Sequence, residues 1–264
     1  MFAEFGNLLG GVERRRRVVL GKLDAMTLIL RSAILNDIGL VRTNNEDSAL
    51  AGDRLIAVAD GMGGLPAGEV ASEIVIRILD ELTPPTAPDE AADALRAVVS
   101  TANQRIHAAI TVDPAREGMG TTLTAALLAG DTLVLAQVGD SRCYLLRDGE
   151  LTQLTRDDTF VQALVDQGAL SPAQARHHPQ RSLVTRAVQG ADTPPAVGRL
   201  GVAAGDRLLL CSDGLSDYVE HDAIGQTLAH YGDRQLCGEQ LVKLAHQAGA
   251  PDNVTVVVSD VTEV

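Results

Sequence analysis

The sequence is poor in aromatic residues: its 264 residues include three Phe, three Tyr and no Trp. Hydrophobic residues still make up 45%, which excludes wholesale disorder and predicts a core built mainly from Ala, Val, Leu and Ile. Proteins that bind nucleic acid by stacking bases on aromatic side chains are disfavoured. The net charge of −13, from 22 basic and 35 acidic residues, argues against binding to nucleic acid or to an acidic membrane surface.

Cysteine and long apolar runs are also scarce. The three cysteines, Cys143, Cys211 and Cys237, are an odd number and include no C-x-x-C pair. This excludes a disulfide framework and a cysteine zinc site, and it predicts a cytoplasmic protein in a reducing environment. No run of 18 apolar residues occurs, so the sequence predicts no transmembrane helix.

Residues 1–25 differ from the rest of the chain, because they carry five basic and three acidic residues. The Arg14–Arg17 run suggests a signal peptide, but only three apolar residues follow before Gly21, which is too short. Three alternatives remain: a disordered basic tail, a partner-binding arm, or sequence upstream of the natural start. Residues 26–264 contain no obvious linker and are expected to form one domain.

Hydrophobic periodicity predicts a mixed fold. Apolar, β-branched runs predict strands near residues 28–35, 54–59, 122–129, 132–138, 142–147, 207–212 and 253–260. Helical spacing predicts helices over 68–82, 89–110 and 234–248. The Asp148-Gly149 pair predicts a hairpin turn. Strands follow strands in the middle of the chain, which indicates an α+β fold with antiparallel sheet.

The main functional signal is that acidic residues stand at the ends of apolar strands. Asp60, Asp140 and Asp213 each follow a strand, and Asp252 precedes the last one. Any one of these is usually an ordinary turn residue. Several together would repel unless cations lay between them, and an oxygen-only ligand set suits Mg²⁺ or Mn²⁺. The six histidines lie away from these motifs in the sequence, which disfavours zinc.

Arg42 stands four residues before the acidic pair Glu46-Asp47. Its guanidinium could bind phosphate with two hydrogen bonds beside a metal cluster. Alternatively, it could be a loop residue that pairs with Glu46 or Asp47. The sequence alone leaves both interpretations open.

Taken together, eight short motifs in order resemble the bacterial members of the PPM (type 2C) family of metal-dependent protein serine/threonine phosphatases. Each motif alone is weak, but the order across residues 34–260 is specific. The motifs are RTNNED (42–47), VADGMGG (58–64), GMGTTL (118–123), VGDSR (138–142), LTRDD (154–158), HPQRSLVTRAV (178–188), CSDGLSD (211–217) and DNVTVVV (252–258).

The resemblance implies a central antiparallel β-sandwich with helix pairs on both outer faces, a four-layer α+β fold. It also implies a centre of two Mn²⁺ or Mg²⁺ ions with a weaker third site. Asp60 would bridge the two ions, the Gly61 carbonyl would bind one, and Asp213 and Asp252 the other. Arg42 would bind the substrate phosphate, and Asp140 with Asp213 and Asp217 would hold the third ion. Glu46, Asp47 and Asn253 would support the centre, with Glu46 as a ligand directly or through water.

The implied reaction is hydrolysis of phosphoserine and phosphothreonine by a metal-bridging water, without a covalent intermediate. Animal relatives carry a proposed acid, His, directly after the Asp-Gly pair, whereas this chain has Met62. The leaving oxygen would then take its proton from a metal-bound water or another group. Residues 156–190 correspond to the flap that borders the site in this family. Phosphorylated proteins, kinases among them, are the expected partners of a monomer.

Other functional classes of protein fit the sequence less well. Cysteine-dependent phosphatases need Cys-x₅-Arg, but Gly149, Asp217 and Lys243 stand six residues after the three cysteines. No P-loop motif is present. A catalytically silent scaffold would be expected to lack some of the metal carboxylates, yet Asp60, Asp213 and Asp252 are all present. A phosphatase for small phosphoesters remains an alternative.

Overall fold

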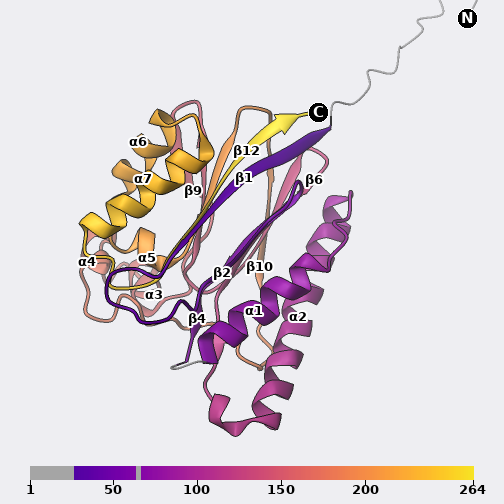
Figure 1. Ribbon diagram of the computed structural model, residues 1–264, viewed down its shortest axis with the longest axis vertical. Helices are drawn as coiled ribbons and strands as arrows, with labels where there is room; N and C mark the ends of the chain where they lie inside the picture. The colour runs from indigo at the N-terminus through magenta and orange to yellow at the C-terminus, as the bar shows by residue number, and fades with distance from the viewer. Residues whose placement is uncertain (1–26, 64–66) are drawn as a thin grey trace, which may run out of the picture.

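Two five-stranded antiparallel sheets form the centre of the computed structural model, which describes residues 27–63 and 67–264 (Figure 1). The first sheet has the order β1 (Leu28–Asp37), β12 (Val254–Glu263), β11 (Arg207–Cys211), β8 (Arg142–Arg147) and β9 (Glu150–Gln153). The second has the order β10 (Ala196–Gly201), β7 (Thr132–Val138), β6 (Leu123–Ala129), β3 (Leu55–Ala59) and β2 (Ser48–Ala51). A small pair, β4 (Gly61–Met62) and β5 (Gly120–Thr121), lies beside the second sheet.

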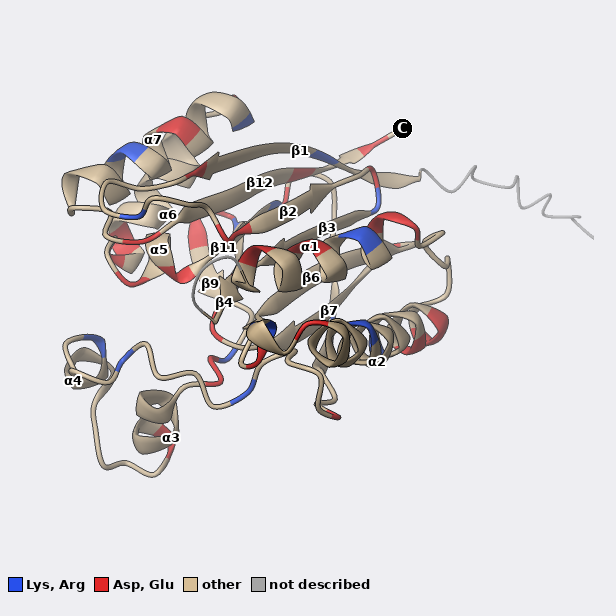
Figure 2. Cartoon of the chain, turned by 60° about the horizontal axis from the view of Figure 1, so that its bottom comes forward, with Lys and Arg blue, Asp and Glu red and all other residues tan. Residues whose placement is uncertain are grey.

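Helices cover the outer face of each sheet. Helices α1 (Ala67–Asp80) and α2 (Pro88–Val112) share a buried apolar cluster with β3, β6 and β7. On the other side, α5 (Asp213–Ser216), α6 (His221–His230) and α7 (Arg234–Gln247) share one with β8, β11 and β12. Figure 2 shows α6 and α7 at the upper left, beside β12, and α1 and α2 on the opposite side, beside β6 and β7. The predicted four-layer α+β sandwich is therefore confirmed.

The two sheets also bury a core between them. It consists of short aliphatic side chains such as Ile56, Leu128, Leu210 and Val257, each fully buried. Because strand side chains alternate between faces, these strands contribute to both an inner and an outer core, and they are apolar on both faces. The scarcity of aromatic residues is thus met by many interleaved Ala, Val, Leu and Ile side chains.

All seven predicted strand regions and all three predicted helices are present. Asp148 and Gly149 have φ angles of 53° and 82°, so the predicted hairpin turn joins β8 to β9 with two left-handed residues. Several further elements are present that the sequence did not predict. These are β2, β4, β5, β9, β10, the short helix Pro114–Arg116, α3 (Phe160–Asp166), α4 (Pro172–Arg176), α5 and α6, although the predicted hairpin turn at Asp148-Gly149 implied a strand at β9.

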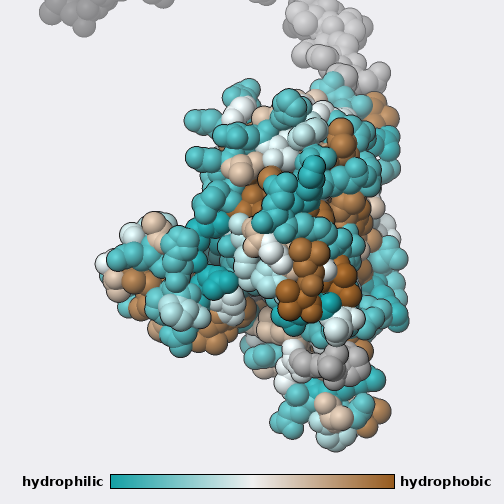
Figure 3. All heavy atoms as spheres, turned by 60° about the vertical axis from the view of Figure 1, so that its left-hand side comes forward, coloured by the Kyte–Doolittle hydropathy of each residue, from teal (hydrophilic) through white to brown (hydrophobic). Residues whose placement is uncertain are grey.

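Helices α3 and α4 lie in a lobe that projects from the sandwich (Figure 2). Figure 3 shows this lobe beside the body, with hydrophilic residues in the hollow between them. Two arginines connect the lobe to the body: Arg176 pairs with Glu220 at 2.9 Å and Arg181 pairs with Asp217 at 3.4 Å. The lobe coincides with the segment 156–190 that the resemblance identified as a flap.

The interpretations of residues 1–25 concern a part of the chain outside the described residues. Within the described part, none of the helices combines the length and the apolar character that a membrane span requires.

Candidate metal centre

The acidic strand ends meet at one end of the sandwich because of strand pairing. Strands β11 and β12 are antiparallel, with Cys211 opposite Val256, so the residues after β11 lie next to those before β12. Asp213 and Asp252 are therefore neighbours. In the other sheet, β6 lies between β3 and β7 in antiparallel register, which brings the ends of β3 and β7, and thus Asp60 and Asp140, to the same edge.

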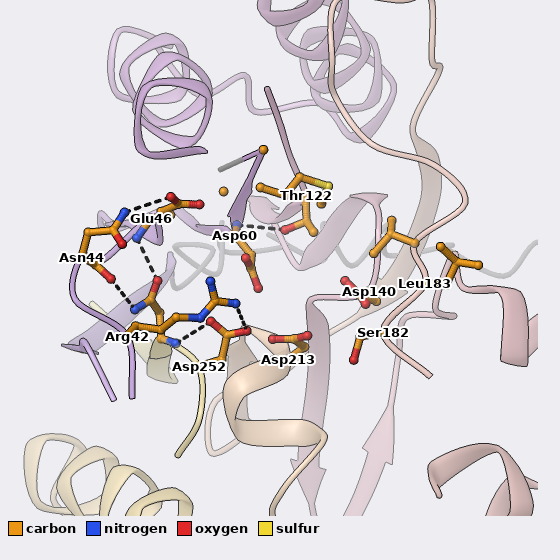
Figure 4. A pocket seen from close by; sticks show the side chains of 15 residues that line it. Arg42, Asn44, Glu46, Asp60, Thr122, Asp140, Ser182, Leu183, Asp213 and Asp252 are labelled. Carbon is orange, nitrogen blue, oxygen red and sulfur yellow. Dashed lines mark hydrogen bonds and ion pairs between the residues drawn. The ribbon is translucent and has the colours of Figure 1, made fainter. Parts of the chain in front are cut away.

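These four carboxylates line a cavity of about 480 Å³ (Figure 4). In Figure 4, Arg42 and Asn44 lie on one side of the cavity, Ser182 and Leu183 on the other, and Asp60 and Asp213 between them. The other lining residues are Glu46, Gly61, Met62, Gly63, Thr122, Asp140, Val184, Asp252 and Asn253. Among these described lining residues, Arg42 alone is basic.

Burial and mutual repulsion raise the pKa values of three of these carboxylates, Asp60, Asp140 and Asp213. The pKa of Asp60 lies well above its usual value because the surrounding protein removes water, and because Asp47, Asp213 and Asp140 repel its charge. Desolvation and the charges of Asp140 and Asp217 likewise hold the pKa of Asp213 well above the usual range. Burial raises the pKa of Asp140 to about 7, with further contributions from Asp157 and Asp217. Such a cluster is stabilised by protons or by cations.

The donor set fits a hard divalent cation. The described lining residues offer carboxylate, amide and hydroxyl oxygens and include no His or Cys, and Gly61 is part of the same lining. Over residues 27–63 and 67–264, no three His, Cys, Asp or Glu side chains are grouped closely enough to enclose an ion by themselves. Mg²⁺ commonly keeps several water ligands and uses only one or two carboxylates, so the arrangement suits Mg²⁺ or the similar Mn²⁺ better than zinc.

We expect cation binding to strengthen as pH rises. Asp60, Asp140 and Asp213 have raised pKa values in the folded protein, so the folded state binds more protons than the unfolded state. For Asp140 the resulting contribution to stability is present below pH 4 and is lost as pH rises through about 7; the contributions of Asp60 and Asp213 are likewise lost as pH rises through their raised pKa values. Cations must replace these protons. Thermal unfolding with chelator and with Mn²⁺ at pH 5.5, 6.5 and 7.5 should show a Mn²⁺-induced rise in Tm that grows with pH; a constant rise would contradict it.

Arg42 pairs with Asp252, its guanidinium nitrogen lying 2.7 Å from a carboxylate oxygen. The hydrogen bond to Asp252 raises the pKa of Arg42 above its usual value. Its side chain is 49% exposed, so part of the guanidinium remains accessible from the cavity. Neither Glu46 nor Asp47 is its ion-pair partner, so the local pairing considered as an alternative is wrong.

Glu46 and Asn253 belong to one hydrogen-bonded network at the cavity wall. The Asn253 side-chain oxygen accepts a hydrogen bond from the Glu46 backbone N–H at 2.9 Å, and its amide donates to the carbonyls of Ile38 and Asn44. The Glu46 carboxylate accepts a hydrogen bond from Asn44 at 2.9 Å. Asn253 thus fixes the loop that carries Arg42 and Glu46 against the strand end that carries Asp252.

Asp47 and Asp217 do not line the cavity. Asp47 is buried beneath it, where Ser212 donates a hydrogen bond at 2.8 Å and burial raises the pKa of Asp47 to about 6. Asp217 pairs with Arg181 and shares with Asp140 a second cavity of about 470 Å³ under the α3–α4 lobe. The predicted third-ion residues therefore span two adjacent cavities, with Asp140 lining both.

Thr122 was not predicted as a functional residue. Its hydroxyl accepts a hydrogen bond from the Asp60 backbone N–H at 3.0 Å and contacts the Ser141 hydroxyl at 2.7 Å. It therefore ties together the residues at the ends of β3 and β7. The motif GMGTTL contained the signal, but its two threonines were given no role. Met62 lines the cavity at the position discussed for a proton donor, and none of the described lining residues is a histidine.

Comparison with known proteins is consistent with this geometry. A family described as "Protein phosphatase 2C" matches residues 42–244. The serine/threonine protein phosphatase PstP of Mycobacterium tuberculosis is 52% identical over 238 residues, which cover 90% of this chain and 46% of PstP. This chain thus spans about half the length of that relative. Protein phosphatase PhpP of Streptococcus pneumoniae is 36% identical over 88% of this chain and 97% of its own.

Solved structures show the same similarity. The crystal structure of the M. tuberculosis phosphatase PstP/Ppp superimposes with a TM-score of 0.86 at 52% identity, covering 89% of this chain and 99% of that one. A structure of the PstP catalytic domain in complex with two manganese ions gives a TM-score of 0.83 at 50% identity, covering 89% and 100%.

Proposed function

Because this chain belongs to the protein phosphatase 2C family, we propose that it is a metal-dependent phosphatase that hydrolyses phosphoserine and phosphothreonine in proteins. The observation that carries the proposal is the group of four carboxylates in a cavity where Arg42 is the one basic residue among the described lining residues. Carboxylates that repel one another favour bound cations, and a nearby guanidinium favours a phosphate. The two manganese ions in the PstP catalytic domain support the same assignment.

We propose that two Mn²⁺ or Mg²⁺ ions are held by Asp60, the Gly61 carbonyl, Asp213 and Asp252. Asp140 would hold a weaker third ion together with Asp213 and Asp217, which lies in the adjacent cavity. Glu46 would assist through its carboxylate, while Asp47 and Asn253 support the centre from behind. When bound, such ions activate water and neutralise charge on phosphoryl oxygens.

The chain's own residues would bind and orient the substrate. Arg42 would hold the phosphate through its exposed guanidinium edge while Asp252 fixes its other side. Asn253 keeps this arginine and Asp252 in one rigid unit. Met62 has no proton to give, so the leaving oxygen would take its proton from water or from another group in the cavity. Among the described lining residues, no cysteine is present and no serine pairs with a histidine, which fits direct hydrolysis.

The proposed substrates are phosphorylated proteins, kinases among them. We propose a monomer as the functional unit. Cys143, Cys211 and Cys237 are buried free thiols, which supports a reducing cytoplasm as the compartment.

The deciding experiment is the release of phosphate from a phosphothreonine peptide with Mn²⁺, with Mg²⁺, and with a chelator. We expect hydrolysis with either ion and none after chelation, restored when Mn²⁺ is added back. A catalytically silent scaffold would show no hydrolysis under any condition. Hydrolysis of a small phosphoester without hydrolysis of any phosphopeptide or phosphoprotein would instead favour the small-molecule phosphatase.

Arg42→Ala should raise KM for the phosphopeptide about tenfold or more while lowering kcat less, because the phosphate loses a charged partner in its bound state. Arg42→Lys should recover only part of the loss, since a lysine cannot form the two-pronged contact. Arg96→Ala is a suitable control, because Arg96 lies on α2 and pairs only with Asp93 on the surface. An unchanged KM in Arg42→Ala would restrict Arg42 to a structural role.

A further inference from the structure

Exposed apolar side chains occur in the segment just before Arg42 and in the lobe segment. Eight large hydrophobic residues are exposed in the described part of the chain, and half of them lie in these two segments. Ile38, Leu40 and Val41 precede Arg42 and are 41%, 60% and 67% exposed. Leu183, from the lobe segment, is 49% exposed and lines the cavity. We call Ile38, Leu40, Val41 and Leu183 the apolar rim.

The backbone that carries the first three rim residues is firmly held. The Ile38 carbonyl accepts a hydrogen bond from the Asn253 side chain at 3.0 Å, and the Leu40 N–H donates to the Ala250 carbonyl at 2.8 Å. The Gly39 N–H donates to Asp37 at 2.8 Å. The loop therefore presents Leu40 and Val41 in a fixed position, although leaving them exposed forgoes the free energy of their burial.

The rim lies within reach of residues that flank a phosphate held by Arg42. Leu40 is two residues from Arg42, so their Cα atoms are at most about 7 Å apart. An extended peptide advances about 3.3 Å per residue, so residues one or two positions from the phosphorylated side chain cover this distance. Leu183 faces Arg42 from the opposite side of the cavity (Figure 4). Figure 3 shows a group of hydrophobic residues on the body, on the same face of the molecule as the α3–α4 lobe.

We propose that the apolar rim binds aliphatic side chains that flank the phosphorylated residue in an extended segment of the substrate protein. This inference rests on the proposed function, because it assigns a substrate preference to the same cavity. The rim residues carry no charge, so acidic or basic flanking residues would gain no ion pair there. Leu, Ile or Val in the substrate would cover Leu40 and Val41 on one side of the phosphate and Leu183 on the other.

The test uses two phosphothreonine peptides that differ only in having Leu or Ser on both sides of the phosphothreonine. For each enzyme variant, kcat/KM for each peptide is divided by kcat/KM for p-nitrophenyl phosphate, which has no flanking residues. We expect the wild-type chain to prefer the Leu peptide by about fivefold, as partial burial of aliphatic side chains would give. The double substitution Leu40→Ser with Val41→Ser, and Leu183→Ser on the other side, should each reduce this preference.

Val112→Ser is the matched control. Val112 is 87% exposed at the end of α2 and does not line the cavity, so this substitution removes an exposed valine elsewhere and should leave the preference intact.

Equal hydrolysis of the two peptides by the wild-type chain would overturn this inference alone. A preference that survives in all rim variants would also overturn it. Rim variants that dissociate a dimer in sedimentation would assign the rim to a second copy of the chain, again against the proposal. Absence of Mn²⁺-dependent hydrolysis of every substrate would overturn the proposed function as well.

Discussion

Asp60→Asn is expected to reduce Mn²⁺-dependent hydrolysis of a phosphothreonine peptide roughly a thousandfold, which corresponds to about 4 kcal/mol of lost transition-state stabilisation. Asp60 lines the cavity, and the charges of Asp47, Asp213, Asp140 and Asp252 all act on it. An amide keeps the shape of this side chain but removes its negative charge, so the site attracts cations less. The measurement is kcat/KM for the peptide at a Mn²⁺ concentration that saturates the wild-type chain.

The same substitution should not unfold the protein. A neutral side chain at position 60 relieves repulsion in the acidic cluster, so the Tm measured with chelator at pH 7.5 should rise or stay unchanged. The increase in Tm on adding Mn²⁺ should shrink. Asp213→Asn should behave alike, since desolvation and neighbouring carboxylates act on it too.

Asp53→Asn provides the matched control for both substitutions. The Asp53 side chain is 71% exposed and pairs only weakly with Arg31 at 3.5 Å. It should retain full activity and the full response of Tm to Mn²⁺. Wild-type activity in Asp60→Asn and Asp213→Asn would refute the assignment of these residues to the metal centre.

The convergence of Asp60, Asp140, Asp213 and Asp252 was predictable because each stands at the end of a strongly apolar strand. Such strands are buried, and the motifs that contain these residues stand along the chain in the order of eight motifs of one family. The sequence could not show which acidic residues face the cavity. Asp47 stands beside Glu46, yet its side chain points inward, where it accepts a hydrogen bond from Ser212 behind Asp60 and does not line the cavity. Neighbours in sequence on an extended segment point in opposite directions.

Arg42 shows a second limit of sequence reasoning. Glu46 and Asp47 were the nearest acids along the chain, and local pairing was the natural alternative. The actual partner, Asp252, is 210 residues away and is brought close only by the register of β1, β12 and the loop that Asn253 holds. Contacts of this kind depend on tertiary structure.

The missed elements have weak local signals. Strand β10 contains two glycines and an arginine and is largely exposed, so it forms only by pairing with β7. Helices α3 and α4 have seven and five residues, too few for a periodic pattern. Ser171 and Gln174 do form a capping box at the start of α4, and this signal in the sequence was overlooked.

Gly39→Ala is expected to disable the site from a position that lies outside the cavity lining. Gly39 has φ of +77°, and a Cβ atom there would lie 2.1 Å from the Asp252 carbonyl oxygen and 2.8 Å from that of Ala250. Contacts this short require one of the two loops to move. The moving loops carry Arg42 and Asp252 themselves, and a displacement of about 1 Å can cost about a hundredfold in rate.

Gly149→Ala separates the effect of this contact from the cost of the backbone conformation. Gly149 has a similar φ of +82°, but no atom lies within 4 Å of the position of its Cβ. Its substitution should lower the free energy of unfolding by about 1 kcal/mol, the cost of a left-handed residue with a side chain, and leave kcat/KM unchanged. Gly39→Ala should cost about 3 kcal/mol or more in urea unfolding and about a hundredfold in kcat/KM for the phosphopeptide. Equal effects of the two substitutions would mean that the approach of Gly39 to Asp252 does not position the site. A larger effect of Gly39→Ala would show that the proposed phosphate-binding arginine and a proposed metal carboxylate depend on one backbone contact between the ends of β1 and β12.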